Sequence, residues 1–201
     1  MKLEIIDNHS VAVDLLTDLP VLDAGCRGFK FTEHFAKRGH TVVALDPAPG
    51  IEVPNIEGTR WSYFYPWALV GPTQPKRAYL RMTEDAEARH LTNAPKEGDP
   101  AIECKSIAEI MDYCKIAQWD LVKLNVEGSE YDILAQWPGE IARQIVVSFH
   151  EHTGNRRGEA AIEGIVEHLG RWYAPAQHVF DERYCAGRNA WDSVFVLKEL
   201  S

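Results

Sequence analysis

The amino-acid sequence predicts an α/β fold with a doubly wound, mostly parallel seven-stranded sheet and an antiparallel edge strand. Three observations predict it. Residues 20–46 have the pattern of a strand, a turn, a helix and a second strand, which is typical of parallel sheets with crossover helices. Helix and strand patterns alternate again over residues 106–137. Near the end of the chain, 177–184 and 192–198 are strand candidates that suit an antiparallel closing hairpin.

Composition and charge limit the classes of function. The chain has 201 residues, a net charge of −9, 45% hydrophobic and 25% charged residues. These values fit a single globular domain over 1–201. The acidic balance disfavours nucleic-acid binding, which needs a basic surface. No apolar run suits a membrane span or a signal peptide. We therefore expect a cytoplasmic protein with free thiols and neither nucleic-acid nor membrane partners; its oligomeric state is left open.

The N-terminal half predicts a helical lead-in followed by the first strand–helix–strand unit. Over residues 1–19, the segment VAVDLLTDL predicts a short helix with Ser10 as its N-cap. The elements expected after it, in chain order, are a strand (20–25), a helix ending at Gly39 (31–39), a strand (40–47), an aromatic strand interrupted by Pro66 (61–70) and a strand (78–82).

The second half continues the alternation after a polar segment, 83–100, which we interpret as a long surface loop. The expected elements are a helix with Ser106 as its N-cap (106–116), a strand (120–128), a helix capped by Ser129 (129–137), a strand (144–152) and a helix ending at Gly170 (158–170).

Two glycines and an acid predict a cofactor site. In open α/β sheets, ligands bind outside the carboxyl ends of the strands. Gly25 and Gly28 follow the first strand and let the backbone turn tightly against a ligand. Asp46 ends the next strand, where a carboxylate can accept hydrogen bonds from both hydroxyls of a ribose. A plain strand-to-helix turn is the alternative. Together the three residues predict an adenosine-containing cofactor.

The residues after Gly28 distinguish between such cofactors. A dinucleotide fingerprint, G-x-G-x-x-G, needs a third glycine for close helix packing, but bulky residues occupy 29–31. A pyrophosphate site, and with it a nicotinamide-dependent oxidoreductase, is therefore disfavoured. S-adenosylmethionine contains no phosphate and tolerates a looser turn. Asp23 and the backbone of the turn, which includes Cys26, can hold its amino-acid end.

Two stretches resemble the FkbM family of class I S-adenosylmethionine-dependent methyltransferases. Residues 21–47 are similar to that family's cofactor turn and ribose acid. Residues 106–137 resemble its pattern of a helix, a strand ending in K-x-D-x-E-G-x-E, and a helix. The segment WALVG looks like the family's adenine-side loop, which implies that Trp67 and Ala68 contact the cofactor; packing in the core is the alternative for Trp67. The resemblance implies a methyltransferase acting on a small-molecule or sugar-containing acceptor.

Two departures from the family pattern keep other hypotheses open. The turn glycines lie one residue closer together than is usual in the family, and Asn125 replaces the strand aspartate. An amide can still bind the cofactor by hydrogen bonds, but it is neither a base nor a good ligand for a divalent metal. Methylation of oxygen is the main hypothesis and methylation of nitrogen the runner-up. A catalytically inactive cofactor-binding or protein-interaction module is the alternative outside the enzymes.

A general base is the remaining part of the chemistry. Methyl transfer depends mainly on alignment of the reacting atoms, but a hydroxyl acceptor benefits from a nearby base. Glu127 and His150, at the ends of neighbouring strands, are the catalytic candidates, with His152 as a weaker one. His150 and His152 share a strand face but lack an identifiable third ligand, so no metal site is predicted.

Overall fold

The structure is a computed structural model that describes residues 1–55, 62–83, 89–150, 158–176 and 190–201. Its strands are β1 (Leu3–Ile6), β2 (His9–Ala12), β3 (Val21–Ala24), β4 (Val42–Leu45), β5 (Ser62–Tyr65), β6 (Trp67–Leu69), β7 (Arg77–Arg81), β8 (His90–Thr92), β9 (Ala101–Lys105), β10 (Trp119–Leu124), β11 (Ala142–His150), β12 (Tyr173–Pro175) and β13 (Ala190–Leu197). Its α-helices are α1 (Lys30–Lys37), α2 (Ile107–Cys114), α3 (Glu130–Leu134) and α4 (Gly158–Leu169).

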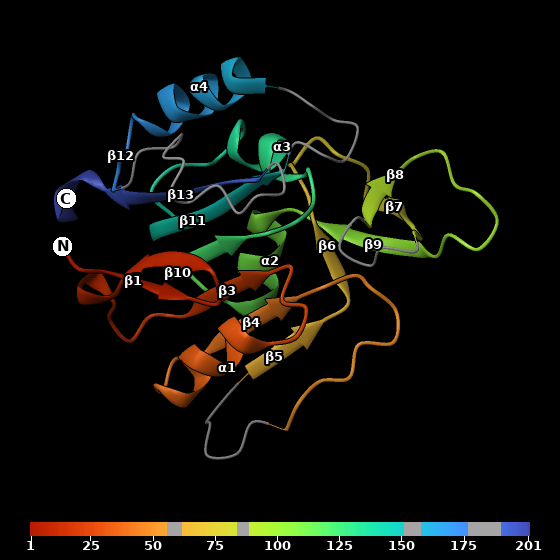
Figure 1. The fold of residues 1–201 in the computed structure, drawn as a ribbon, viewed down its shortest axis with the longest axis horizontal. Helices are drawn as coiled ribbons and strands as arrows, with labels where there is room; N and C mark the ends of the chain where they lie inside the picture. The colour runs from red at the N-terminus through yellow and green to blue at the C-terminus, as the bar shows by residue number, and fades with distance from the viewer. Residues whose placement is uncertain (56–61, 84–88, 151–157, 177–189) are drawn as a thin grey trace.

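A large mixed sheet confirms the predicted α/β class. Seven strands lie in the order β12-β13-β11-β10-β3-β4-β5, from the top to the bottom of Figure 1. Neighbours from β11 to β5 pair in parallel, whereas β13 is antiparallel to both β11 and β12. The antiparallel strand was expected at the edge but lies one place inside it. The short β12 pairs with the outer edge of β13. The strand predicted over 177–184 lies outside the described residues.

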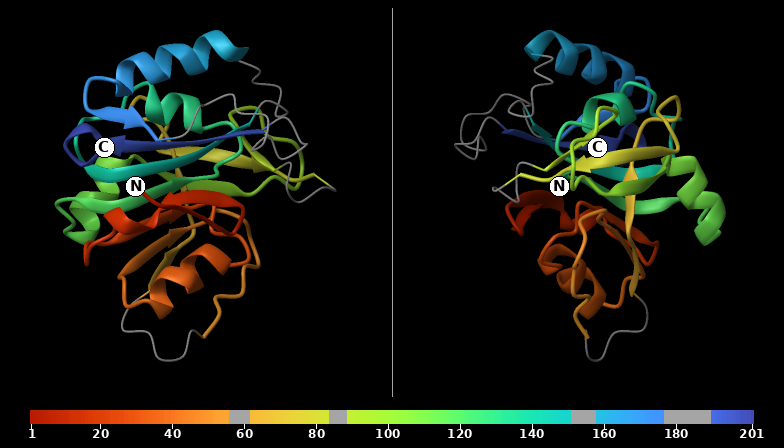
Figure 2. Two further views of the ribbon diagram at one scale, coloured as in Figure 1. Left: turned by 60° about the vertical axis from the view of Figure 1, so that its left-hand side comes forward. Right: turned by 90° about the vertical axis from the view of Figure 1, so that its right-hand side faces the viewer.

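Helices and a hairpin cover the two faces of this sheet. Side chains along each strand alternate between the faces. One set packs with apolar residues of α2, α3 and α4, and the other with α1 and the β1–β2 hairpin. In the right-hand view of Figure 2, the red hairpin and the orange α1 lie on one side and the green α2 on the other. The predicted helices after the first strand and after Ser106 are confirmed, the latter with a capping box between Ser106 and Glu109.

A second sheet was not predicted. The strands β6, β9, β7 and β8 form a separate four-stranded sheet in that order. Pro66 separates β5 from β6, so the aromatic segment is divided between the two sheets rather than forming one strand. The interpretation of 83–100 as a loop is wrong at β8, which pairs with β7. In Figure 1 the second sheet lies beyond the carboxyl ends of the parallel strands, opposite both termini.

The predicted helical lead-in over residues 1–19 is wrong. Residues 3–12 form the hairpin of β1 and β2, with Ile6 paired to His9 across a two-residue loop. Asp7 and Asn8 both have positive φ, of 47° and 67°, as the tight turns of two-residue hairpins require. Ser10 therefore lies within a strand instead of capping a helix, and only a 3-10 turn, Val13–Leu15, follows.

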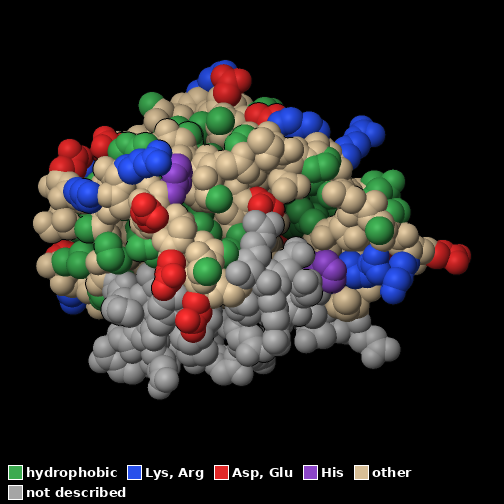
Figure 3. Space-filling view, turned by 90° about the horizontal axis from the view of Figure 1, so that it is seen from above, with side chains coloured by type: hydrophobic (Ala, Val, Ile, Leu, Met, Phe, Trp, Pro, Cys, Tyr) green, Lys and Arg blue, Asp and Glu red, His purple; other side chains and the backbone are tan. Residues whose placement is uncertain are grey.

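Charged side chains of both signs lie on the face shown in Figure 3. In Figure 3, Lys and Arg side chains form separate groups with acidic side chains among them on the visible face. Within the described ranges, no helix has the length and apolar character needed to cross a membrane. Cys26, Cys104 and Cys114 are free cysteines.

Gln144 fixes the hairpin to the large sheet, and its loss is expected to destabilise the protein. Its buried side-chain amide accepts from the Ala12 N–H at 3.1 Å and donates to the Ala12 carbonyl at 3.3 Å. Replacing it by leucine (Gln144→Leu) leaves both backbone groups unsatisfied, so we expect a loss of about 2 kcal/mol or more in urea unfolding.

Gln118→Leu is the matched control. It removes one exposed hydrogen bond, from the Gln118 amide to the Glu140 carbonyl, and is expected to cost under about 0.5 kcal/mol. Equal losses in the two variants would show that the hairpin does not depend on Gln144.

Candidate active site

The turn after β3 lies directly against the end of β4. The N–H groups of Gly25 and Cys26 both donate to the Leu45 carbonyl, at 2.8 and 3.2 Å. Gly25 has φ of +78° and Gly28 of +80°, a region that glycine adopts without strain. A Cβ on Gly25 would lie 1.9 Å from the Asn125 carbonyl oxygen, whereas none of the described atoms lies within 4 Å of the corresponding position on Gly28. Gly25 is therefore required by packing against β10, and Gly28 faces open space.

A buried ion pair between Lys123 and Asp23 holds this turn in place. Lys123 of β10 is 3% exposed and donates to Asp23 Oδ1 at 2.9 Å and to the Gly25 carbonyl at 2.8 Å. Thr32 of α1 donates to Asp23 Oδ2 at 2.7 Å. Both oxygens of the predicted cofactor residue Asp23 thus accept hydrogen bonds from the chain itself. The sequence reasoning missed Lys123, although its position two residues before Asn125 places it on the same strand end.

Asp46 lies beside the turn. It follows β4, is 7% exposed, and accepts at Oδ1 from the Ala48 N–H at 2.9 Å. Burial raises the pKa of its carboxyl, opposed by that hydrogen bond and by the positive charges of Lys123 and Arg27. The predicted ribose acid and the predicted glycine turn are therefore brought together around one carbonyl group, that of Leu45.

The other predicted cofactor residues have different surroundings. Cys26 is buried with Phe29 and Ala44, and burial raises the pKa of its thiol, which leaves it unreactive. Trp67 stacks on Tyr65 at 4.4 Å, has Lys105 over its ring, and belongs to the main core. Ala68 belongs to the apolar cluster of the second sheet, against which Ala48 packs. Ala68 thus shares a cluster with Ala48, whose N–H donates to Asp46, whereas Trp67 belongs to the main core.

The loop after β10 is organised by Glu130. This carboxylate is fully buried and accepts from the N–H groups of Val126 and Gly128, at 2.8 and 2.7 Å, and from His150 Nδ1 at 2.8 Å. Ser129 occupies the N-cap position of α3 but makes no capping side-chain hydrogen bond. The buried Oδ1 of Asn125 has no hydrogen-bond partner among the described residues.

His150 lies between two carboxylates. Its Nε2 is 3.4 Å from Glu127 Oε1, so the two predicted catalytic residues are adjacent. Burial lowers the pKa of His150, but the hydrogen bond and charge of Glu130, with the charges of Glu127 and Asp192, outweigh burial and raise the pKa above 6.5. The imidazolium form is thereby favoured, and Glu127, 24% exposed, is the member that reaches solvent.

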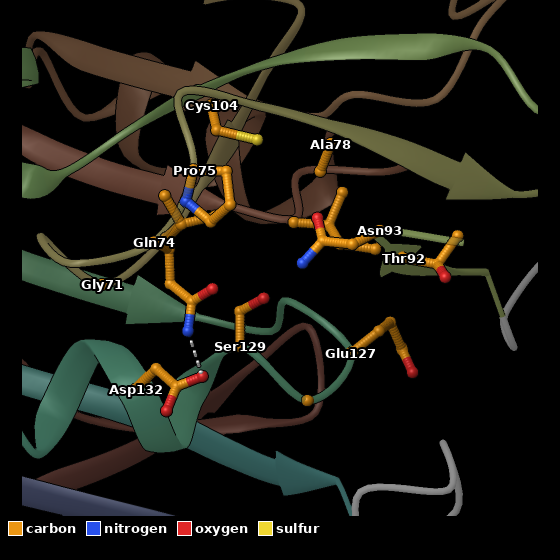
Figure 4. A pocket seen from close by; sticks show the side chains of 13 residues that line it. Gly71, Gln74, Pro75, Ala78, Thr92, Asn93, Cys104, Glu127, Ser129 and Asp132 are labelled. Atoms are coloured by element: carbon orange, nitrogen blue, oxygen red, sulfur yellow. Dashed lines mark hydrogen bonds between the residues drawn. The ribbon is translucent and has the colours of Figure 1, made fainter. Parts of the chain in front are cut away.

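A pocket of about 240 Å³ opens beside Glu127, between the second sheet and the loop after β10 (Figure 4). It is lined by Val70, Gly71, Gln74, Pro75, Ala78, Leu91, Thr92, Asn93, Cys104, Glu127, Gly128, Ser129 and Asp132. Sequence reasoning missed this pocket, because most of its wall comes from the strands and loops of the unpredicted sheet.

Metal ligation finds no support in the described part of the chain, where no group of three His, Cys, Asp or Glu side chains is placed to hold an ion. The weaker base candidate, His152, lies outside the described residues.

Comparisons with known proteins identify a family model and similar folds. The methyltransferase FkbM domain model matches residues 25–179. Magnesium protoporphyrin IX methyltransferase (ChlM) from Synechocystis PCC 6803 with bound SAM has a similar fold, with a TM-score of 0.51 and 16% identity over 93% of this chain and 74% of that chain. A Burkholderia thailandensis 1,6-didemethyltoxoflavin-N1-methyltransferase gives a TM-score of 0.43 and 16% identity over 89% and 71% of the two chains. No curated protein sequence matches.

The two turn glycines form a matched pair of test sites. Both have positive φ, so alanine at either position costs about 1–2 kcal/mol in backbone conformation. Gly25→Ala also forces its Cβ against the Asn125 carbonyl, and we expect a much larger loss of unfolding free energy in urea, or no folded protein. Similar losses for Gly25→Ala and Gly28→Ala would contradict the packing argument.

The environment of His150 predicts a pH-dependent contribution to stability. Because its folded pKa lies above 6.5, the value expected for the unfolded chain, the protonated ring stabilises the fold below about pH 6.5, and this contribution is lost as the pH rises through the folded pKa. Urea unfolding of the wild type and of His150→Gln should therefore differ most at low pH, with the gap narrowing above neutrality. Glu130→Gln should reduce this pH dependence; a gap that widens with pH would refute the assignment.

Proposed function

Since this chain belongs to the FkbM methyltransferase family, we propose that it transfers a methyl group from S-adenosylmethionine to a hydroxyl oxygen of a small-molecule or sugar-containing acceptor. The observation that supports this most strongly is the contact of the glycine turn and the end of β4 through the Leu45 carbonyl, which sets Asp46 beside the turn.

The residues present fit S-adenosylmethionine. Asp46 offers a carboxylate for the ribose hydroxyls, and Gly28 leaves open space at the turn. The buried Asn125 Oδ1, which lacks a partner among the described groups, suits an ammonium donor. Ala68 provides an apolar contact on the adenine side. Asp23, Gly25 and Cys26 shape the turn, and Trp67 supports β6 from the core. The cofactor supplies a methyl group activated by its sulfonium.

Glu127 is the proposed base. Its carboxylate borders the pocket and can accept the proton of an acceptor hydroxyl. His150 acts behind it: Glu130 holds Nδ1, and Nε2 faces Glu127. This chain of groups orients the Glu127 carboxylate and compensates its charge. Because alignment accounts for most of the catalysis in methyl transfer, fixing this loop is as useful as proton removal.

Calorimetric titration with S-adenosylhomocysteine, with NAD as the control ligand, tests the cofactor assignment. One-to-one binding of S-adenosylhomocysteine alone supports the methyltransferase. Binding of neither ligand would favour an inactive protein-interaction module, and preference for NAD would favour an oxidoreductase.

Asp46→Ala is expected to weaken S-adenosylhomocysteine binding by about 1–3 kcal/mol, since ribose hydroxyls then lose their acceptor. Asp112→Ala is the matched control, because Asp112 is an exposed residue of α2 paired only with Lys115 among the described groups. The same titration measures both variants. An unchanged affinity in Asp46→Ala would refute the ribose assignment.

A further inference from the structure

The pocket beside Glu127 shares an apolar cluster with residues near the proposed cofactor site. Val70 and Ala78 line the pocket and belong to the apolar cluster that also contains Ala68. Ala48 packs on the same cluster and donates its N–H to Asp46. At the other end, Glu127 joins the pocket to His150. A group in this pocket therefore lies against the proposed base, Glu127, and against the apolar cluster that also contains Ala68, which suits a methyl acceptor.

The charged side chains that line the pocket, among the described residues, are acidic. They are Glu127 and Asp132, and none of the described lining residues is Lys, Arg or His. An anionic acceptor would meet like charges in a partly desolvated space, which is unfavourable. Both carboxylates also have partners within the protein: Glu127 faces His150, and Asp132 accepts from the Gln74 amide at 2.9 Å. The lining therefore does not require a cation either.

The remaining polar lining is neutral and can both donate and accept. Figure 4 shows the Gln74 amide and the Ser129 hydroxyl pointing toward the space that Asn93 faces from the second sheet. Gln74 Nε2 donates to Asp132, so the side-chain carbonyl oxygen of Gln74 is the group that can accept from a ligand. Hydroxyl groups donate and accept, as these amides and hydroxyls do, so they are complementary to them.

We propose that this pocket holds the methyl acceptor through Gln74, Asn93 and Ser129, and that it selects an uncharged, hydroxyl-rich group over an anionic one. This inference rests on the proposed function, since it assigns the acceptor side of the same site. The small volume of the pocket, about 240 Å³, suits one ring or one end of a larger acceptor.

Amide-detected NMR titration of the protein saturated with S-adenosylhomocysteine tests it. The probes are methyl β-D-glucopyranoside and methyl β-D-glucopyranosiduronic acid, which share a ring and differ by one carboxylate at neutral pH. We expect the uncharged glycoside to shift the side-chain amides of Gln74 and Asn93, and to bind at least fivefold more tightly than the uronic acid. Equal or reversed affinities, or shifts confined to other residues, would overturn the proposal.

A positive charge introduced at the pocket tests whether its charge determines the preference between the two probes. Asn93 is exposed, so Asn93→Lys should fold normally and abolish or invert the preference against the uronic acid. Ala117→Lys adds the same charge at an exposed site near the start of β10, the opposite end of that strand from the pocket, and should leave the preference unchanged. An unaltered preference in Asn93→Lys would overturn the proposal.

Different results would refute the proposed function and the acceptor assignment. Absence of S-adenosylhomocysteine binding would refute the proposed function. Normal binding of S-adenosylhomocysteine, with no response of the pocket amides to the uncharged glycoside, would refute only the acceptor assignment.

Discussion

The ammonium group of Lys123 is the constraint on which the proposed active site depends. A buried charge is tolerated only where it is paired and hydrogen-bonded, and Lys123 meets both conditions through Asp23 and the Gly25 carbonyl. Asp23 in turn binds Thr32 of α1. One ion pair thus joins β10, β3, the turn and α1. Removing either partner would leave the other charge uncompensated in the core, which is far more costly than losing the net attraction of the pair.

Glu130 applies the same principle on the other side of Asn125. Its buried carboxylate is satisfied by two backbone N–H groups and by His150. The backbone between Lys123 and Glu130 is therefore fixed from both ends, and Glu127 is held at a φ of +52°, which non-glycine residues rarely adopt. Lys123, Asp23 and Glu130 are thus partnered by the protein itself, whereas Asn125 Oδ1 has no partner among the described residues and is proposed to bind the cofactor.

The rule that ligands bind at the carboxyl ends of strands explains what the sequence could predict. Strand ends can be located from short apolar runs and the turn residues after them. That was enough to bring Gly25, Asp46, Glu127 and His150 to one edge of the sheet, as the structure does. The same local pattern does not reveal the N-terminal hairpin, because VAVDLLTDL also suits a helix. The structure forms a hairpin here, with Ile6 paired to His9 and positive φ at both turn residues.

The buried partners were missed for a different physical reason. A lysine or a glutamate in sequence normally indicates an exposed side chain, and nothing local shows that Lys123 will face Asp23, 100 residues away. Glu130 could be seen only as a favourable charge at a helix start. Strands were predicted at the positions of β6 and β7, but β8 and β9 were missed because they are short and lie within or beside the polar segment 83–100. No local pattern shows that these four strands form a sheet of their own.

The two walls of the site therefore differ in how firmly they are determined. The proposed cofactor side is fixed to the large sheet by the buried charges of Lys123, Asp23 and Glu130, so a change there disturbs several elements at once. The pocket wall consists of short strands and half-exposed polar side chains, joined to α3 by the Gln74–Asp132 hydrogen bond. Substitutions at Gln74 or Asn93 can alter the shape and charge presented to an acceptor without touching Lys123 or Glu130. Acceptor specificity can thus change while the cofactor geometry is preserved.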